Sequence, residues 1–519
     1  MQFPCNSIAS NHSIIPKNPP GFGIPIGNYQ KIKFTSPTEK INNIALLILL
    51  GSMVVGLAGV IIVSTLVGTI ALIAISIDQI RSRVWAYRFR SDLPASHTKT
   101  DLNAPHLGSK STADVLIVNN AENSFKWKKE LLSIAETSIE FSPNFAGGED
   151  FREILDIIKT RMTNSSKLRT HILLSNDLLE KTDISKLNDL NKTFGNRFKY
   201  LITNRIYHTS PYLHSEENHV KMLVVDGKYF VIGGTGIHPK MDRQDVCKTT
   251  IKKVNKKNFS SKFFDQGFRD TDLVGKGQIA LTLRSQFFSL FQKWENRMRY
   301  HDKNTFFAND FFPIENATQG TCDKFDKAKG LIKNVSLRCF VGGPEHRKRN
   351  PITHRIAMRI NKATQEIRFG NLLFNPDEII KKELQNKNKE SIKIAGHFNS
   401  AGNNSSLSHW IYVLPNRTNY SLLTNAYEYD QPNQLYHKKV ATFDKKYTII
   451  GSYNLGQKSA SCDDEIILEI KNADVAKQVN EGLKEDVNHS KEIKESKLDT
   501  FFNKIAGAIA IGILGPFFG

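Results

Sequence analysis

A short motif that occurs twice constrains the fold of this chain of 519 residues more than any other feature of its sequence. Each copy has a histidine, a lysine two residues later and an aspartate five residues after the lysine: His219, Lys221 and Asp226, then His437, Lys439 and Asp444. Residues i and i+2 of a β-strand point to the same face of a sheet, and each aspartate begins a turn into a second apolar run. Each copy therefore predicts a β-hairpin, and the pair predicts one site built from two similar hairpins.

The second strand of each predicted hairpin runs into small residues. Tyr229 to Ile232 is followed by Gly233-Gly234, and Tyr447 to Ile450 is followed by Gly451-Ser452. Small residues allow a backbone or a phosphate group to approach an imidazole closely. With this addition the motif resembles the signature of the phospholipase D superfamily, His-x-Lys-x-x-x-x-Asp followed by Gly-Gly or Gly-Ser.

The continuation of the second copy extends this resemblance, and the first copy departs from it at one position. Four residues look like the family's Gly-Ser-x-Asn, basic-Ser and terminal Glu pattern: Asn454, Lys458, Ser459 and Glu465. In the first copy Gly236 stands where the pattern has Asn, whereas Phe268-Arg269-Asp270-Thr271 resembles an acidic segment of cardiolipin synthase-like members. The resemblance implies two α/β halves that share one active site.

Two imidazoles and two ammonium groups suit the cleavage of a phosphodiester. A neutral imidazole attacks the phosphorus and gives a phospho-histidine, and a protonated imidazole donates to the leaving oxygen. The resemblance implies that His219 is the nucleophile and His437 the general acid. Lys221 and Lys439 would supply fixed positive charge to the phosphate oxygens, so we expect no cofactor and no metal.

Carboxylates and hydrogen-bonding groups are expected to support these four residues. The resemblance implies that carboxylates cross between the halves, with Glu465 orienting the first histidine and Asp270 the second. It also implies that Asn454 and Ser459 add hydrogen bonds to the phosphate site. The two motif aspartates begin turns, so we expect each to tie its own hairpin rather than to touch substrate.

An internal repeat outside the motifs predicts the same two halves. Ala135 to Phe141 resembles Ala363 to Phe369 at an offset of 228 residues, whereas the motif histidines are 218 residues apart. Two homologous halves that differ by a short insertion explain both offsets. In each half the expected order is helix, strand, helix, strand and motif hairpin, which predicts an α/β sandwich.

The chain after residue 112 divides into four expected parts: a first half (113–300), a crossover (301–335), a second half (336–485), and a charged helix with an apolar tail (486–519). An aromatic stripe at 279–294 is expected to pack in the core of the first half. The charged segment 471–500 predicts a surface helix. The tail at 505–519 predicts a second membrane contact, with a docked C-terminal segment as the alternative.

The N-terminal part predicts a membrane attachment and has three expected parts: a flexible leader (1–40), a transmembrane hairpin (41–80) and a linker (81–112). The 34 uncharged residues of 44–77 would make a helix of about 50 Å, well beyond a hydrocarbon core of roughly 30 Å. Glycines near its midpoint and basic residues on both flanks favour a hairpin with both ends cytoplasmic, and a buried helical hairpin is the alternative. Its hydropathy resembles that of inclusion-membrane proteins of intracellular bacteria, which implies a bacterial or host-derived inclusion membrane.

Three functional interpretations follow from these features. The net charge of +20 favours phosphate-bearing partners such as anionic lipid or nucleic acid. The leading interpretation is a membrane-attached enzyme that hydrolyses a phosphatidyl ester of a phospholipid or transfers the phosphatidyl group to an alcohol acceptor. The membrane segment disfavours the second, a superfamily nuclease, and the two complete His/Lys pairs disfavour the third, a catalytically silent membrane or effector protein. Five widely spaced cysteines predict reduced thiols.

Overall fold

The computed structural model describes residues 107–175, 178–203, 217–242, 267–299, 321–346, 349–400, 412–431 and 434–493. Its first half consists of β1 (Ser111–Asn119), α3 (Ala121–Ser133), β2 (Ser138–Asn144), α4 (Gly148–Asn164), β3 (Arg169–Ser175), α5 (Lys181–Phe194), β4 (Phe198–Thr203), β5 (Met222–Val225), β6 (Tyr229–Gly233), α6 (Pro239–Asp242), β7 (Gly267–Arg269), β8 (Thr271–Gly277) and α9 (Ile279–Arg299).

A short helix, α10 (Asp323–Asp326), precedes the second half. That half consists of β9 (Ile332–Gly342), α11 (Pro351–Lys362), β10 (Glu366–Asn371), α12 (Glu378–Lys389), β11 (Lys393–Asn399), α14 (Leu414–Thr418), β12 (Asn425–Tyr429), β13 (Gln434–Tyr436), β14 (Lys439–Phe443), β15 (Tyr447–Gly451), α15 (Gln457–Ser461), β16 (Glu465–Lys471), α16 (Ala473–Val487) and β17 (Ser490–Glu492).

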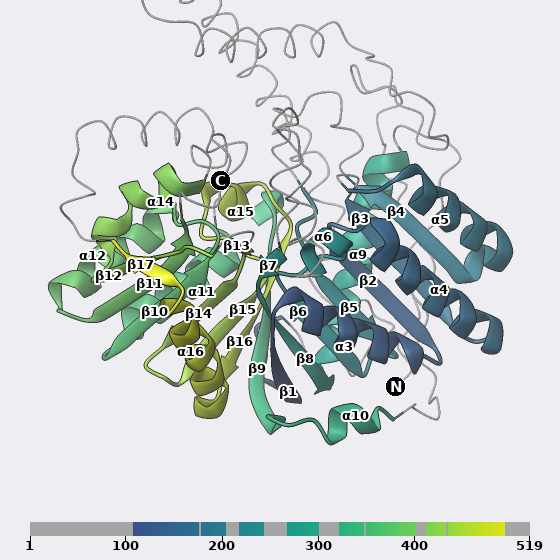
Figure 1. Ribbon diagram of the computed structural model, residues 1–519, viewed down its shortest axis with the longest axis horizontal. Helices are drawn as coiled ribbons and strands as arrows, with labels where there is room; N and C mark the ends of the chain where they lie inside the picture. The colour runs from purple at the N-terminus through teal and green to yellow at the C-terminus, as the bar shows by residue number, and fades with distance from the viewer. Residues whose placement is uncertain are drawn as a thin grey trace, which may run out of the picture.

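One 15-stranded mixed sheet runs through both halves. From the centre outward the first half has β1, β8, β6, β5, β2, β3 and β4, and the second half has β9, β16, β15, β14, β10, β11 and β12, with β17 at the outer edge. The strands β1 and β9 pair in an antiparallel manner where the halves meet, so the two halves lie side by side (Figure 1). The matched order makes the halves pseudo-twofold, and the predicted pair of α/β halves is present.

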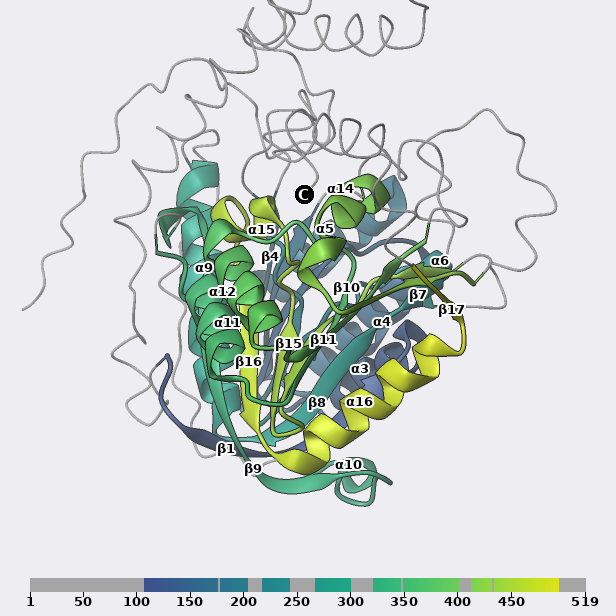
Figure 2. The ribbon, with the colours of Figure 1, turned by 90° about the vertical axis from the view of Figure 1, so that its left-hand side faces the viewer.

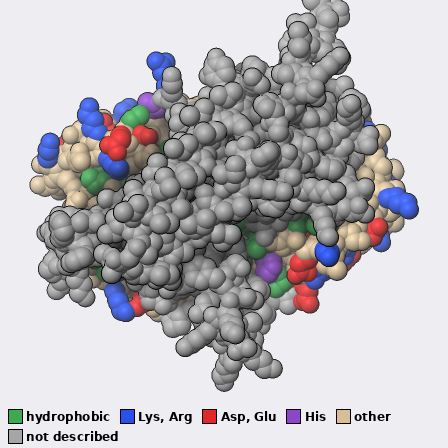
Figure 3. Space-filling view, turned by 90° about the horizontal axis from the view of Figure 1, so that it is seen from above, with side chains coloured by type: hydrophobic (Ala, Val, Ile, Leu, Met, Phe, Trp, Pro, Cys, Tyr) green, Lys and Arg blue, Asp and Glu red, His purple; other side chains and the backbone are tan. Residues whose placement is uncertain are grey.

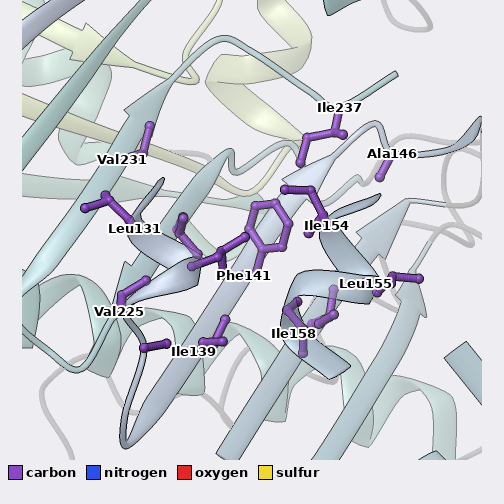
Figure 4. Packing of buried hydrophobic residues seen from close by; sticks show 14 of the residues in the cluster. Leu131, Ile139, Phe141, Ala146, Ile154, Leu155, Ile158, Val225, Val231 and Ile237 are labelled. Carbon is purple, nitrogen blue, oxygen red and sulfur yellow. The ribbon is translucent and has the colours of Figure 1, made fainter. Parts of the chain in front are cut away.

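Helices cover both faces of the sheet. In the first half, α3 and α4 lie on the face of the sheet opposite to α9. In the second half, α11 and α12 lie on the face opposite to α16, as Figure 2 shows. Ile154, Leu155 and Ile158 recur at helical spacing on α4 and pack with Ile139 and Phe141 of β2 (Figure 4). Because β2 also contacts α9 on its opposite face, every residue of β2 is buried.

The seam between the halves is filled by one helix from each. The predicted aromatic stripe lies on α9, and its Phe287, Phe291 and Trp294 are buried in the same core as Val479 and Leu483 of α16. The core prediction is therefore confirmed for α9.

The charged segment after the second motif differs from the prediction in its length and in its burial. It forms α16, which ends at Val487, so only its last two residues fall in the expected final part (486–519), of which the structure describes 486–493. Its inner face is buried because apolar residues recur at i, i+4 and i+8 among the charges. The strand β17 follows it and pairs with β12.

The remaining predictions concern membrane contacts at the two ends of the chain. Among the described residues, no helix is long and apolar enough to cross a membrane. The predicted leader, transmembrane hairpin, most of the linker and the tail at 505–519 lie outside the described residues. On the face shown in Figure 3, described acidic and basic side chains lie mixed at both outer ends of the molecule.

Candidate active site

The two motifs form the hairpins that their spacing predicts. The first histidine and lysine precede β5, and the strand turns at Asp226 into β6; Lys439 opens β14, which turns at Asp444 into β15. Both aspartates have a left-handed backbone, with φ of 53° and 52°. The Asp226 carboxylate accepts hydrogen bonds from the backbone N–H groups of residues 136–138, and that of Asp444 accepts from those of residues 364–366. Both therefore tie their hairpins to the preceding helix–strand turn.

Each motif histidine is paired with a carboxylate from the other half. Nδ1 of His219 lies 2.9 Å from Oε1 of Glu465, at the start of β16. Nδ1 of His437 lies 2.7 Å from Oδ2 of Asp270, just before β8. The structure thus brings together these four predicted residues across the seam. With Nδ1–H donated to a carboxylate, Nε2 is the imidazole atom that can meet a substrate; in His437 it lies 3.1 Å from Nζ of Lys439.

The backbone crosses the seam at the same two places. The N–H of His219 donates to the carbonyl of Asp464 (3.1 Å), and the N–H of His437 donates to the carbonyl of Arg269 (2.9 Å). Each histidine is therefore fixed to the residue that precedes its carboxylate. The site exists only where both halves are folded together.

The lysines of the motifs lie beside their histidines and are buried. Nζ of Lys221 donates to the carbonyl of His219 (3.0 Å), and Nζ of Lys439 donates to the carbonyl of His437 (2.8 Å). Burial, with Lys439 as a second cause, lowers the pKa of Lys221 to about 7. Burial lowers the pKa of Lys439 to about 8. Two neighbouring cations that repel one another would be stabilised by an anionic group such as a phosphodiester.

A comparison with known families decides what this site belongs to. The family described as cardiolipin synthase, PLD-like domain, matches residues 356–487, which contain the second motif. Residues 356–487 form a domain of the phospholipase D superfamily. The match also confirms the prediction that the chain carries a phospholipase D-type enzyme domain, similar to that of cardiolipin synthases.

Two solved structures are similar to this chain to different degrees. Phosphatidylserine synthase from Haemophilus influenzae Rd KW20 matches with a TM-score of 0.55 and 13% identity, over 84% of this chain and 100% of that chain. The phospholipase D family member Nuc from Salmonella typhimurium matches with a TM-score of 0.25 and 19% identity, over 31% of this chain and 99% of that chain. No curated protein sequence matches the chain. The first of these matches shows a shared two-half architecture.

Two glycines of the site are required by close contacts. A Cβ atom on Gly234 would lie 2.4 Å from both carboxylate oxygens of Asp270. A Cβ atom on Gly236 would lie 2.6 Å from the carbonyl oxygen of Phe145. The departure from the superfamily pattern at Gly236 therefore has a packing cause, because an Asn there would collide with the loop after β2.

Ser459 and Asn454 lie beside the first histidine–carboxylate pair, and their predicted hydrogen bonds to a phosphate stay a prediction. The Ser459 hydroxyl donates to Oε1 of Glu465 (2.5 Å), so it supports the carboxylate. The backbone N–H of Asn454 donates to the Ser459 hydroxyl (3.3 Å), and its side-chain carbonyl has no hydrogen-bond partner among the described residues. The Ser452 hydroxyl also donates to Glu465, a contact that was not predicted.

The two carboxylates differ in their ionisation. Burial opposes the charged form of Glu465, but His219, Lys221 and the Ser452 hydroxyl hold its pKa below its ordinary value. Burial raises the pKa of Asp270 to about 6, against the opposite effect of Lys439. The first imidazole therefore faces a firmly ionised carboxylate, and the second faces one that titrates near neutral pH.

Both imidazoles favour the neutral form in this structure. Burial lowers the pKa of His219, and Glu465 acts in the opposite direction. Burial, then Lys439 and Lys221, lower the pKa of His437 well below its ordinary value. A phosphate bound between the lysines would offset their effect, so substrate binding favours protonation of His437.

Sequence reasoning missed a charged network beside His219. Lys458 donates to Glu217 (2.5 Å) and lies 3.4 Å from Asp463. Burial opposes ionisation of Glu217, yet Lys458 and His219 lower its pKa to about 2. Burial raises the pKa of Asp463 well above its ordinary value. The i, i+2 spacing of His219 and Lys221 extends back to Glu217, so the sequence could have indicated that Glu217 lies on the same side as the two motif residues.

The first histidine and two neighbouring carboxylates carry atoms that a metal could bind. These atoms of His219, Asp463 and Glu465 lie within 4.8 Å of one another. The Glu465 carboxylate already accepts from two serine hydroxyls and contacts His219, so these groups form a hydrogen-bonded set without a metal. The expectation of metal-independent chemistry stays a prediction.

Proposed function

We propose that the protein cleaves the phosphodiester of a phospholipid through a phospho-histidine and passes the phosphatidyl group to water or to an alcohol. The observation that carries this proposal is the pair of His–carboxylate contacts that cross between the halves, with a buried lysine beside each histidine. Two equivalent imidazoles on one site allow one to attack while the other donates a proton.

In the first step, neutral Nε2 of His219 attacks the phosphorus, and the bond to the leaving alcohol oxygen breaks. The protonated imidazole of His437 donates its proton to that oxygen, so the alcohol leaves uncharged. The ammonium groups of Lys221 and Lys439 stabilise the charge on the remaining phosphate oxygens. The product of this step is a phosphatidyl group bonded to His219.

In the second step, His437 acts as a base. It takes a proton from water or from an acceptor alcohol, whose oxygen attacks the phosphorus and releases His219. Water gives hydrolysis and an alcohol gives transfer. The match to the cardiolipin synthase domain family and the fold shared with a phosphatidylserine synthase support transfer of a phosphatidyl group.

Attachment to a membrane forms part of the proposal. The apolar residues 44–77 are long enough for a hairpin, and basic residues flank them on both sides. We propose that this hairpin keeps the catalytic body on the cytoplasmic side, at a bacterial or host-derived inclusion membrane. Deletion of residues 41–80 should release much of the protein from membranes. Labelling of Thr35→Cys and Ala95→Cys from opposite faces of the membrane would contradict the hairpin.

The test of the chemistry uses the full chain in detergent or liposomes. Labelled phosphatidylglycerol and phosphatidylethanolamine are supplied with and without an added alcohol, and the products are separated by chromatography. We expect phosphatidic acid without the alcohol or a new phosphatidyl ester with it, and neither from His219→Ala. Cleavage of DNA or RNA without any change in the phospholipids would favour the nuclease interpretation instead, and no turnover of any substrate would favour a silent protein.

A further inference from the structure

Asn144, the last residue of β2, has an unusual backbone and no role in the chemistry described so far. It is fully buried, and its φ of 55° lies in the left-handed region, which Asn tolerates better than most residues. The pairing of β2 with β3 shifts register between Phe141 and Asn144. Asn144 still pairs with Leu174, and the irregularity lies in the part of β2 that adjoins the first motif.

The Asn144 amide lies between two groups of that motif. With its oxygen toward the ammonium of Lys221 the distance is 3.1 Å, and its nitrogen then donates to the carbonyl of Asn218 (2.8 Å). The neighbours fix this orientation, because an ammonium can only donate and a carbonyl can only accept. The amide therefore holds a lysine and the backbone of the motif at once.

Neighbouring residues at the end of β2 add to this hold. The Ser142 hydroxyl donates to the carbonyl of Val220 (3.0 Å) and accepts from the side-chain amide of Asn218 (3.1 Å). The ring of Phe145 lies 5.5 Å from Nζ of Lys221. Contacts from Ser142, Asn144 and Phe145 thus fix the segment that carries the first histidine and lysine.

The second half lacks this arrangement, although its strand β10 also ends in an asparagine. Oδ1 of Asn371 accepts from the backbone N–H groups of Leu373 (3.1 Å) and Leu455 (3.2 Å). Among the described residues its side chain makes no hydrogen bond to Lys439, although the two residues face each other across β10 and β14; Nζ of Lys439 instead lies 3.1 Å from Nε2 of His437. An amide anchor therefore holds Lys221, and the described residues show none on Lys439.

We propose that Asn144 is a positioning residue that keeps the Lys221 ammonium charged and fixed toward the reacting phosphate, while Lys439 is left to follow the phosphate between the two steps. This role rests on the proposed function for its catalytic meaning. Its structural content, that the amide favours the charged form of one lysine, can be measured without turnover.

The charges around Lys221 make such an anchor useful. Lys439 lowers the pKa of Lys221, whereas Glu465, Glu217 and Asp270 raise it. The two motif imidazoles also face it, and burial outweighs the acidic groups, which leaves the ammonium only marginally favoured at neutral pH. A hydrogen bond to the charged form raises the pKa of a group, so loss of the Asn144 acceptor should lower that of Lys221 by about one unit.

The test compares Asn144→Gly, Asn144→Asp and Asn371→Gly in the full chain. Glycine keeps the left-handed backbone and removes the amide, whereas aspartate keeps an acceptor and adds negative charge. Asn371→Gly is the matched control, because it removes the corresponding amide of the second half, which makes no hydrogen bond to Lys439 among the described residues, and adds no charge beside that lysine. The probe is inorganic sulfate, whose charge is constant in this range, and its affinity is measured by calorimetry between pH 6 and pH 9.

Sulfate affinity should fall with rising pH as the lysines lose their protons. We expect the midpoint of this fall to move down by about one pH unit in Asn144→Gly, up in Asn144→Asp, and to stay in place in Asn371→Gly. The rate constant kcat/KM for phospholipid should shift along the pH axis in the same way.

A midpoint that is unmoved in both Asn144 variants would overturn the proposal, even if they are less stable, because a purely structural role lowers stability without shifting a titration. If Asn144→Gly does not fold, Asn144→Asp decides alone. If the midpoints shift as expected but no protein hydrolyses or transfers lipid, the positioning role stands and the proposed function fails.

Discussion

The two halves of the molecule carry the same His–Lys motif but surround it differently. Glu465, behind His219, accepts from two serine hydroxyls, and its pKa is held below the ordinary value. Asp270, behind His437, accepts from the backbone N–H of Thr271 (2.8 Å), and its pKa is raised to about 6. Homologous halves thus give two carboxylates of different strength, which separates an attacking imidazole from one that exchanges protons.

The two helices at the seam also differ in the charge of their contacts: α9 offers a basic residue to an acidic one, and α16 offers an acidic residue to a basic one. On one side Asp464 contacts Lys293 and accepts from Nε1 of Trp294 (2.9 Å) on α9. On the other side Arg269 donates to Asp486 (2.8 Å) on α16. Each residue precedes the carboxylate that orients a histidine, so each half fixes the other half's catalytic pair. Duplication preserved the connection across the seam and not the residues that make it.

The largest expected effect is the loss of either histidine. His219→Ala and His437→Ala should each lower kcat by about 1,000-fold or more, because one removes the nucleophile and the other the proton donor. Turnover of labelled phospholipid measures this, with a chelator as the parallel treatment. Wild-type rates in His219→Ala, or loss of activity on chelation, would be incompatible with the mechanism.

The carboxylates should follow in the order of their support. Glu465→Gln should lower kcat by about 100-fold at both pH 6 and pH 8, whereas Asp270→Asn should lower it by about tenfold at pH 6 and by more at pH 8, since Asp270 is partly protonated near pH 6 and Glu465 stays ionised. Steady-state kinetics of both variants at pH 6 and pH 8 measure the difference. Equal losses at both pH values would show that the two halves support their histidines alike.

The lysines set the expected pH dependence. Their pKa values are lowered to about 7 for Lys221 and about 8 for Lys439, so the charged forms are present at lower pH and are lost as pH rises through these values. We expect kcat/KM to fall above pH 7 to 8, and the corresponding fall in kcat to occur at higher pH, because bound phosphate favours the ammonium forms. A kcat/KM that stays level up to pH 10 would refute the lowered values.

The smallest expected difference concerns the hairpin turns. Asp226 is buried and Asp444 is half-buried, although each accepts from three backbone N–H groups. Asp226→Gly should lower the free energy of unfolding by about 3 kcal/mol and Asp444→Gly by about 1 to 2 kcal/mol, since glycine keeps the left-handed turn in both. Urea unfolding followed by circular dichroism measures both. A larger loss in Asp444→Gly would reverse the inferred order of burial.

Much of the architecture could be predicted from sequence because it is written in local periodicity. The i, i+2 spacing of His219 and Lys221 predicted a hairpin strand, and these residues lie directly before β5. The repeat around Ile139 and Ile367 predicted the two halves. The crossing of Glu465 and Asp270 came from family resemblance, since no local pattern shows which residues meet across a seam.

The parts that could not be predicted depend on backbone geometry and on contacts between distant segments. Asn144 reaches Lys221 because of a register shift at the end of β2, and a strand pattern does not show such a shift. Ser459 faces Glu465 because α15 folds back over the start of β16. The buried face of α16 was obscured by its many charged residues.

The central claim is one composite site in which His219 carries the phosphoryl group and His437 moves the protons. The most direct test supplies a phosphodiester with an activated leaving group to His437→Ala, His219→Ala and wild-type protein, followed by rapid quenching and mass spectrometry of peptides under alkaline conditions. An activated leaving group needs no acid, so the His437→Ala variant should accumulate a phosphorylated peptide that contains His219, and the His219→Ala variant should show none. A phosphorylated His437 in His219→Ala would reverse the roles of the two halves, and the absence of any adduct in all three proteins would contradict covalent catalysis.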